Sequence, residues 1–166
     1  MGNRNEDHKR MCRIYNLRRS REKLKRLLLA NFRDGEQLVT LTYGPGTRAP
    51  AVALATRQLQ DWVRAVRREL GHQFLYVRAT EWDGRGNGHH VHRVVMGLSA
   101  ADVAASVPLW GYGPVVTVQQ VQGEALEAVA DLMMAQAIEA GQGPAKQKRV
   151  WTPSCGLHRP GMDREA

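Results

Sequence analysis

Apolar and polar residues alternate along the chain with two different periods, which predict helices and strands. Leu24, Leu27 and Leu28 form an apolar stripe with helical spacing, and Ser20 is placed to cap that helix. Residues 1–15 carry no such stripe and are expected to be a loose polar lead. Strands are predicted at 38–43, 74–82, 89–96 and 115–121, and helices at 20–32, 52–70, 99–106 and 124–140.

The order of these predicted elements indicates the fold class. After the first helix it reads β-α-β-β-α-β-α, which is typical of the split βαβ arrangement. We therefore expect an α+β fold in which an antiparallel sheet carries its helices on one face, next to a basic N-terminal helix. Residues 83–88, DGRGNG, consist of turn formers and predict a hairpin between the second and third strands.

The net charge of +8 is concentrated at the N-terminus. Residues 1–33 contain eleven Lys and Arg against three Asp and Glu, whereas residues 34–166 are neutral overall. Such a basic segment most often binds nucleic acid, and a solvated face that aids solubility is the alternative. The sequence has no apolar run of about 20 residues. It shows no secretory signal and only two distant cysteines, so a cytoplasmic location without membrane contact is expected.

Two histidines on one predicted strand form the sharpest chemical feature. His90 and His92 stand at alternate positions, so their imidazoles project from the same face, about 7 Å apart. Glu81 lies at a neighbouring level on the preceding strand of the same hairpin. One carboxylate and two imidazoles with open coordination positions suit Mg²⁺ or Mn²⁺ acting as a Lewis acid on a phosphate.

The alternation of side chains also allows other interpretations of this hairpin. Strict alternation places Glu81 on the apolar face with Val77 and Ala79, so a bulge or a twisted strand end is needed to turn it toward the histidines. His89 is a substitute ligand. An exposed histidine pair beside a turn, without a metal, is the alternative to a metal site.

Four segments in succession resemble the nicking domain of rolling-circle replication initiators, the HUH endonucleases of phages and plasmids. The segments are LVTLTY (38–43), EWDGRGNGHHVHRVVMG (81–97), LWGYGPVVTV (109–118) and KRVWTPSCGL (148–157). The resemblance implies a ferredoxin-like, HUH-type fold that cuts single-stranded DNA. In that family a metal polarises the phosphate and a tyrosine attacks it, leaving a 5′-phosphotyrosine and a free 3′-hydroxyl.

The resemblance also implies roles for residues and regions. His90, His92 and Glu81 would hold the metal, and Thr40 and Thr42 would border the site. The regions are a basic N-terminal arm and helix (1–33), a nicking and DNA-binding domain (34–145) and a basic C-terminal tail (146–166).

The nucleophile is absent from the place where the family carries it. No tyrosine occurs between residues 124 and 141, and the matching stretch reads LMMAQ (132–136). Relaxases, which belong to the same superfamily, carry their nucleophile near the N-terminus, so Tyr15 is the candidate here. A tyrosine that only packs against the domain is the alternative for Tyr15. Tyr43, Tyr76 and Tyr112 are expected to be structural.

Three functions are compatible with these features. The first is a replication initiator-like protein that binds single-stranded or hairpin origin DNA and nicks it as a metal-dependent endonuclease. The second is a DNA-binding module of the same fold without nicking activity, which the missing tyrosine favours. The third is a phosphodiesterase that uses water. A host helicase or other replication proteins would be separate partners, because the sequence contains no P-loop. The residues expected to contact DNA are Arg18, Arg19, Arg21, Lys25, Arg26, Trp82, Lys146, Lys148 and Arg149.

Overall fold

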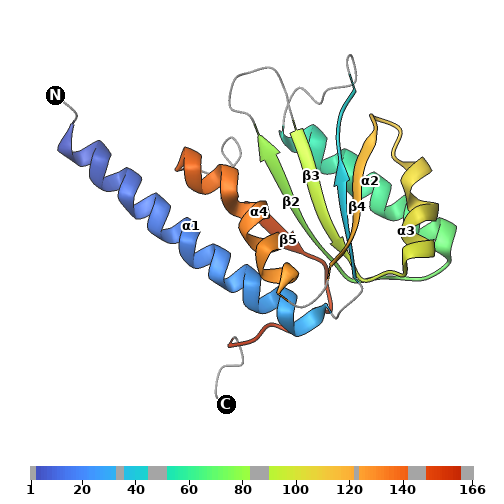
Figure 1. Ribbon diagram of the computed structural model, residues 1–166. Helices are drawn as coiled ribbons and strands as arrows, with labels where there is room; N and C mark the ends of the chain where they lie inside the picture. Colours follow the sequence, from blue (N-terminus) through green and yellow to red (C-terminus); the bar gives the residue numbers. More distant parts are fainter. Residues whose placement is uncertain are drawn as a thin grey trace.

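The computed structural model describes residues 3–32, 36–44, 52–82, 90–121, 124–141 and 149–161. The predicted helices and strands are present, with ends shifted by a few residues and one short strand added near the C-terminus (Figure 1). In chain order the elements are α1 (Arg4–Asn31), β1 (Glu36–Leu41), α2 (Val52–Leu70), β2 (Tyr76–Trp82), β3 (His90–Met96), α3 (Ala100–Ser106), the short 3-10 helix η1 (Val107–Leu109), β4 (Val115–Val121), α4 (Ala125–Ala140) and β5 (Trp151–Pro153).

The strands form one antiparallel sheet in the order β4-β1-β3-β2-β5. β1 and β3 lie side by side within it, with Leu38 opposite Val95 and Leu41 opposite His92. α2 connects β1 to β2 across the intervening β3, and α3 connects β3 to β4 across β1. This is the split βαβ, ferredoxin-like topology, so the expected α+β fold with an antiparallel sheet is confirmed.

The two faces of the sheet pack into two separate hydrophobic cores, because side chains alternate along a strand. Leu38 and Val95 belong to the core shared with α1 and α4, whereas Val39 and Val94 belong to the core shared with α2 and α3. The sequence predicts helices on one face, and the two crossover helices α2 and α3 share a face in this way. α1 and α4 cover the opposite face as well (Figure 1), because the strands are apolar on both sides.

α1 is one continuous helix of 28 residues, which corrects the expectation of a loose lead followed by a helix beginning at Ser20. Asn3 caps its N-terminus by accepting a hydrogen bond from the Asn5 amide (3.3 Å). Glu6 and Asp7 stand in the first turn, where carboxylates interact favourably with the helix dipole. Ser20 therefore lies inside the helix, and its hydroxyl oxygen accepts a hydrogen bond from the Trp151 indole (2.9 Å).

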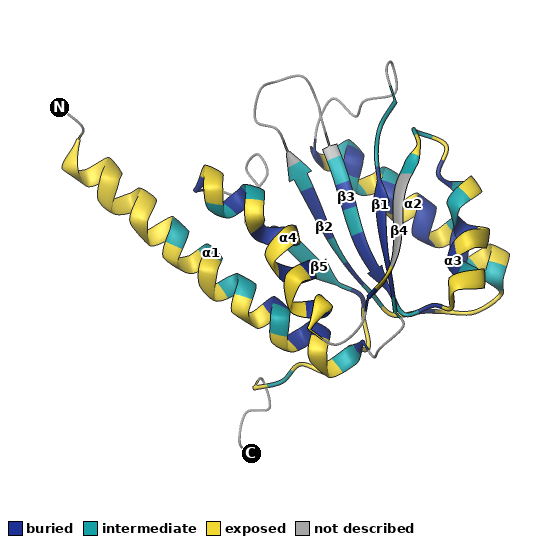
Figure 2. Ribbon diagram, in the orientation of Figure 1, coloured by how far each residue is buried: buried dark blue, intermediate teal, exposed yellow. Residues whose placement is uncertain are grey.

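Only the second half of α1 is part of the core. Leu24, Leu27 and Leu28 are buried against the sheet and α4. Most residues of the first half are exposed, and this half of the helix extends beyond the body of the molecule (Figure 2). Arg13, within the first half, donates a hydrogen bond from Nε to the Gly141 carbonyl oxygen (3.2 Å), at the C-terminal end of α4. None of the described helices is long and apolar enough to cross a membrane.

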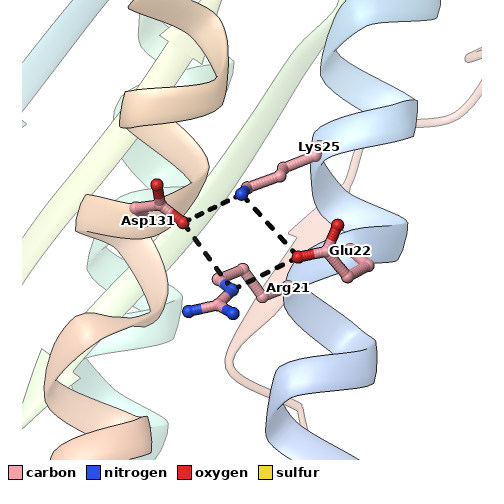
Figure 3. A network of polar contacts seen from close by, with 4 residues as sticks. All are labelled: Arg21, Glu22, Lys25 and Asp131. Atoms are coloured by element: carbon pink, nitrogen blue, oxygen red, sulfur yellow. Dashed lines mark ion pairs between the residues drawn. The ribbon is translucent and has the colours of Figure 1, made fainter.

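Four charged side chains join α1 to α4. Lys25 Nζ lies 3.2 Å from Asp131 Oδ1, and Arg21 Nε lies 3.6 Å from the same oxygen. Glu22, on α1 like Arg21 and Lys25, pairs with both of these residues, at 3.5 Å from Arg21 and 3.7 Å from Lys25 (Figure 3). Two of the predicted DNA contacts, Arg21 and Lys25, thus have carboxylate partners within the protein.

Candidate functional site

His92 lies at the centre of a hydrogen-bonded group on the α2/α3 face of the sheet. Its side chain is fully buried. Nδ1 shares a hydrogen bond with the Thr80 hydroxyl on β2 (2.8 Å), and Nε2 shares one with the Tyr43 hydroxyl just after β1 (2.9 Å). Thr80 stands directly opposite His92 in the register of β2 and β3, so both side chains leave the same face. The three residues form a chain of hydrogen bonds across three adjacent strands.

Aromatic rings surround this group on the same face. The Tyr43 ring lies 5.4 Å from Trp110 and 5.6 Å from the His92 ring, and the Trp110 and Tyr112 rings are 5.0 Å apart. Trp62 from α2 completes the shell at 6.4 Å from Trp110. Edge-on contacts of this kind stabilise aromatic clusters beyond their burial. The shell holds the Tyr43 hydroxyl against His92.

The turn that carries Trp110 and Tyr112 is fastened to the end of β1. The Trp110 indole donates a hydrogen bond to the Thr42 carbonyl oxygen (2.8 Å), and the Gly44 amide donates one to the Tyr112 carbonyl oxygen (3.0 Å). A Cβ atom at Gly113 would overlap the backbone of residues 42–44, so this close approach requires glycine. The WGYG segment therefore positions Tyr43.

Tyr43 is the tyrosine with the most altered environment in the described part of the chain. Burial, and to a smaller extent the neighbouring Tyr112, raise the pKa of its hydroxyl well above the ordinary value. Proton loss to water is therefore disfavoured. His92 Nε2 lies 2.9 Å from this hydroxyl, and in the tautomer whose Nε2 carries no proton it can accept the hydroxyl proton, as a reaction of this oxygen requires.

Glu81 and Arg93 form an ion pair on the opposite face of the sheet. Arg93 Nε donates a hydrogen bond to Glu81 Oε1 (2.9 Å), and its NH1 lies 3.4 Å from the Thr40 hydroxyl. Both charged side chains are about one-fifth exposed, at 19% and 21%. Thr40 is buried on this face beside the pair. Thr42, the other residue expected to border the site, donates a hydrogen bond to the Pro114 carbonyl oxygen.

This placement does not bring Glu81 and His92 together. Glu81 is paired with Val91 and His92 with Thr80, without a bulge in the register, so the carboxylate and the imidazole leave opposite faces. Both imidazole nitrogens and the carboxylate are also engaged by protein groups. Glu81 and His92 thus do not fit a shared Mg²⁺ or Mn²⁺ site.

The remaining predicted ligands lie partly outside the described residues. The backbone of His90 is paired with Trp82, two positions beyond the pair of Thr80 with His92. The side chains of His90 and Trp82 and all of His89 are outside the described part. Within that part no cluster of three or more His, Cys, Asp or Glu could hold a metal ion. Metal binding by His90 stays a prediction.

Tyr15, the predicted nucleophile, stands on the exposed half of α1. Its side chain is 62% exposed, and the Arg19 guanidinium lies 5.9 Å above its ring. α1 packs on the face of the sheet opposite to His92, so the structure does not bring Tyr15 and His92 together. A catalytic role of Tyr15 stays a prediction.

The predicted DNA contacts fall into three groups. Arg18 and Arg19 are exposed on α1 without a carboxylate partner among the described residues. Arg26 and Arg149 line a pocket between α1 and β5, whereas Arg21 and Lys25 belong to the network with Asp131. Lys146 and Lys148 are outside the described residues.

Sequence reasoning missed the partners of His92. A hairpin closed by the predicted 83–88 turn places Ala79, not Thr80, opposite His92, so the sequence alone did not identify Thr80. The structure pairs Trp82 with His90, and this register sets Thr80 opposite His92. Tyr43 carried a weaker signal, since its side chain follows the end of β1 and approaches His92 only through the turn at residues 110–113.

Fold and site together define a class of protein: a ferredoxin-like α+β domain with a buried histidine on a central strand. A long basic helix packs on the opposite face of its sheet. The family of replication-associated proteins ORF2/G2P matches residues 36–136, which is more than half of the chain. The chain belongs to this family, and a role in replication follows. Searches of curated proteins and of solved structures found no match.

Proposed function

We propose that the protein serves replication by binding single-stranded or hairpin DNA. The observation that carries the proposal is the exposed pair Arg18 and Arg19 on α1, which has no carboxylate partner among the described residues, in a member of a replication-associated family. Arg18 and Arg19 stand on that surface, where phosphates can replace their counterions. The protein's charge excess lies in the same segment of the sequence.

The binding test measures fluorescence anisotropy of a labelled DNA hairpin with a single-stranded flank, over a range of salt concentrations. The double variant Arg18→Gln with Arg19→Gln is expected to weaken binding roughly tenfold and to lower the slope of log K against log salt by about two. Arg57→Gln is the matched control, because Arg57 is exposed on α2 and has no carboxylate partner among the described residues. Equal affinities of the double variant and the control would contradict the proposal.

Nicking of the bound strand is the second candidate function, favoured by the contact of 2.9 Å between the Tyr43 hydroxyl and His92 Nε2. In such a reaction the Tyr43 oxygen attacks the phosphorus, and its proton passes to His92 Nε2. The bond from phosphorus to the 3′-oxygen breaks, and the 3′-oxygen leaves as a hydroxyl after taking up a proton. The product is a 5′-phosphotyrosine.

The nicking test uses end-labelled hairpin DNA on a denaturing gel, with Mn²⁺ or Mg²⁺ in one arm and EDTA in the other. A covalent adduct that Tyr43→Phe abolishes and Tyr15→Phe retains supports Tyr43 as nucleophile. The reverse pattern supports Tyr15. A nick without an adduct indicates attack by water, and intact binding without a nick indicates a binding module. An adduct lost with EDTA directs the search for metal ligands to His90.

A further inference from the structure

A basic pocket lies between α1, the strand β5 and the segment that follows β5. Its volume is about 430 Å³. Four cationic residues line it. Lys23 and Arg26 belong to α1, Arg149 precedes β5 and Arg159 follows β5. Among the described residues no carboxylate lines the pocket, and none of the four cations has an ion-pair partner there. Four like charges around one cavity attract an anion.

The walls of the pocket are joined by hydrogen bonds between segments far apart in the sequence. The Trp151 indole donates to the Ser20 hydroxyl oxygen (2.9 Å), which ties β5 to α1. The Asn31 side chain bonds the backbone of His158 twice, accepting from the amide (2.7 Å) and donating to the carbonyl oxygen (2.6 Å). The pocket is therefore held open by the fold, so that little ordering is needed when a ligand binds.

The floor of the pocket is apolar and includes an aromatic ring. Leu27 and Val150 are buried there, and Trp151 is half-buried with its indole N–H fixed by Ser20. An inorganic anion would use only the cationic rim. A nucleotide uses both parts, because its phosphate meets the cations while its base lies on the apolar floor and the indole ring.

We infer that this pocket binds one nucleotide, with its phosphate between Lys23, Arg26, Arg149 and Arg159 and its base against Trp151. The nucleotide is a unit of the single strand that the protein holds, so this inference rests on the proposed DNA binding. A free nucleoside monophosphate offers the same chemistry, and the experiment separates the two sources.

The experiment titrates the full-length protein with a thymidine oligonucleotide, with thymidine monophosphate and with inorganic phosphate. Anisotropy gives the affinity for the oligonucleotide. The indole N–H signals in ¹H–¹⁵N NMR spectra report contact with the pocket, and the signal of Trp151 is identified by its loss in Trp151→Phe. Arg149→Gln and Arg159→Gln probe the rim, and Arg57→Gln is the control.

The expected result is that the oligonucleotide shifts the Trp151 signal. Arg149→Gln and Arg159→Gln should each weaken its binding roughly fivefold and lower the salt slope by about one, whereas Arg57→Gln should change neither. Oligonucleotide binding that leaves the Trp151 signal and both variants unaffected overturns the pocket and leaves the proposed function standing.

If no oligonucleotide binds, the proposed function fails. A response to thymidine monophosphate that the two variants weaken then still supports a nucleotide site, and no response overturns it. A response to inorganic phosphate equal to that of the nucleotide also overturns the role of the base.

Discussion

The two faces of the sheet bury polar side chains in different ways. On the α2/α3 face, His92 is fully buried and bonded to two neutral hydroxyl groups, those of Thr80 and Tyr43. On the α1/α4 face, Glu81 and Arg93 pair as ions while about one-fifth of each side chain reaches the solvent. A buried group needs hydrogen-bond partners, whereas a charged pair gains from partial solvation. His92 and Arg93, which are adjacent on β3, therefore lie in different environments.

Replacing His92 should damage the α2/α3 face most. His92→Ala leaves a cavity and removes one partner each from Thr80 and Tyr43, so the free energy of unfolding should fall by about 3 kcal/mol. Urea denaturation followed by circular dichroism measures this loss. His158→Ala is the control, because its side chain is exposed and its backbone bonds to Asn31 remain; a similar loss in both variants would contradict the assignment.

Breaking the ion pair should cost less. Glu81→Gln or Arg93→Met removes one partner of a partly solvated pair, and each should lower the free energy of unfolding by about 1–2 kcal/mol. The double variant should lose less than the sum of the two single losses, because the two side chains contact each other. Since Glu81 faces away from His92, Glu81→Gln should also leave any Mn²⁺ binding unchanged, as calorimetric titration can measure. Additive losses would show that the pair is not formed.

Removing one hydroxyl from the neutral face should have a smaller effect. Tyr43→Phe keeps the aromatic contacts with Trp110 and deletes the bond to His92, so a loss of about 1 kcal/mol is expected. Tyr15→Phe, at an exposed site, should lie within about 0.5 kcal/mol of the wild type. Equal stability of the two variants would mean that the Tyr43 bond contributes nothing.

The last effect should appear only at high pH. The pKa of Tyr43 is raised in the folded protein by burial, so the unfolded chain loses this proton first as the pH increases. The stabilisation is complete below the unfolded pKa of about 10 and is lost as the pH rises above it toward the folded value. Ultraviolet titration of the wild type should show one tyrosine ionising late, and Tyr43→Phe should remove that late step. Four tyrosines that titrate together would exclude the raised pKa.

The sequence predicts the fold better than the site. Periodicity identified the central strands and the crossover helices, because apolar residues such as Leu38 and Val39 must be buried on each face. Parity also indicated that Glu81 stands on the apolar face with Val77 and Ala79, and the register places its side chain on the face opposite to that of His92. The contact of Tyr43 with His92 depends on the turn at residues 110–113. The basic pocket depends on the meeting of α1, β5 and the segment that follows β5. Such long-range contacts have no local pattern in a single sequence.

The hydrogen bond from Arg13 to the Gly141 carbonyl couples the ends of two helices. α4 has no basic residue in its last turn, so its partial negative charge is offset by a cation from α1. Fraying of the first half of α1 around Arg13 would therefore expose the carbonyl end of α4, and the two segments should open together. In hydrogen exchange, the last turn of α4 should thus report the order of α1, although the two lie more than a hundred residues apart in the sequence.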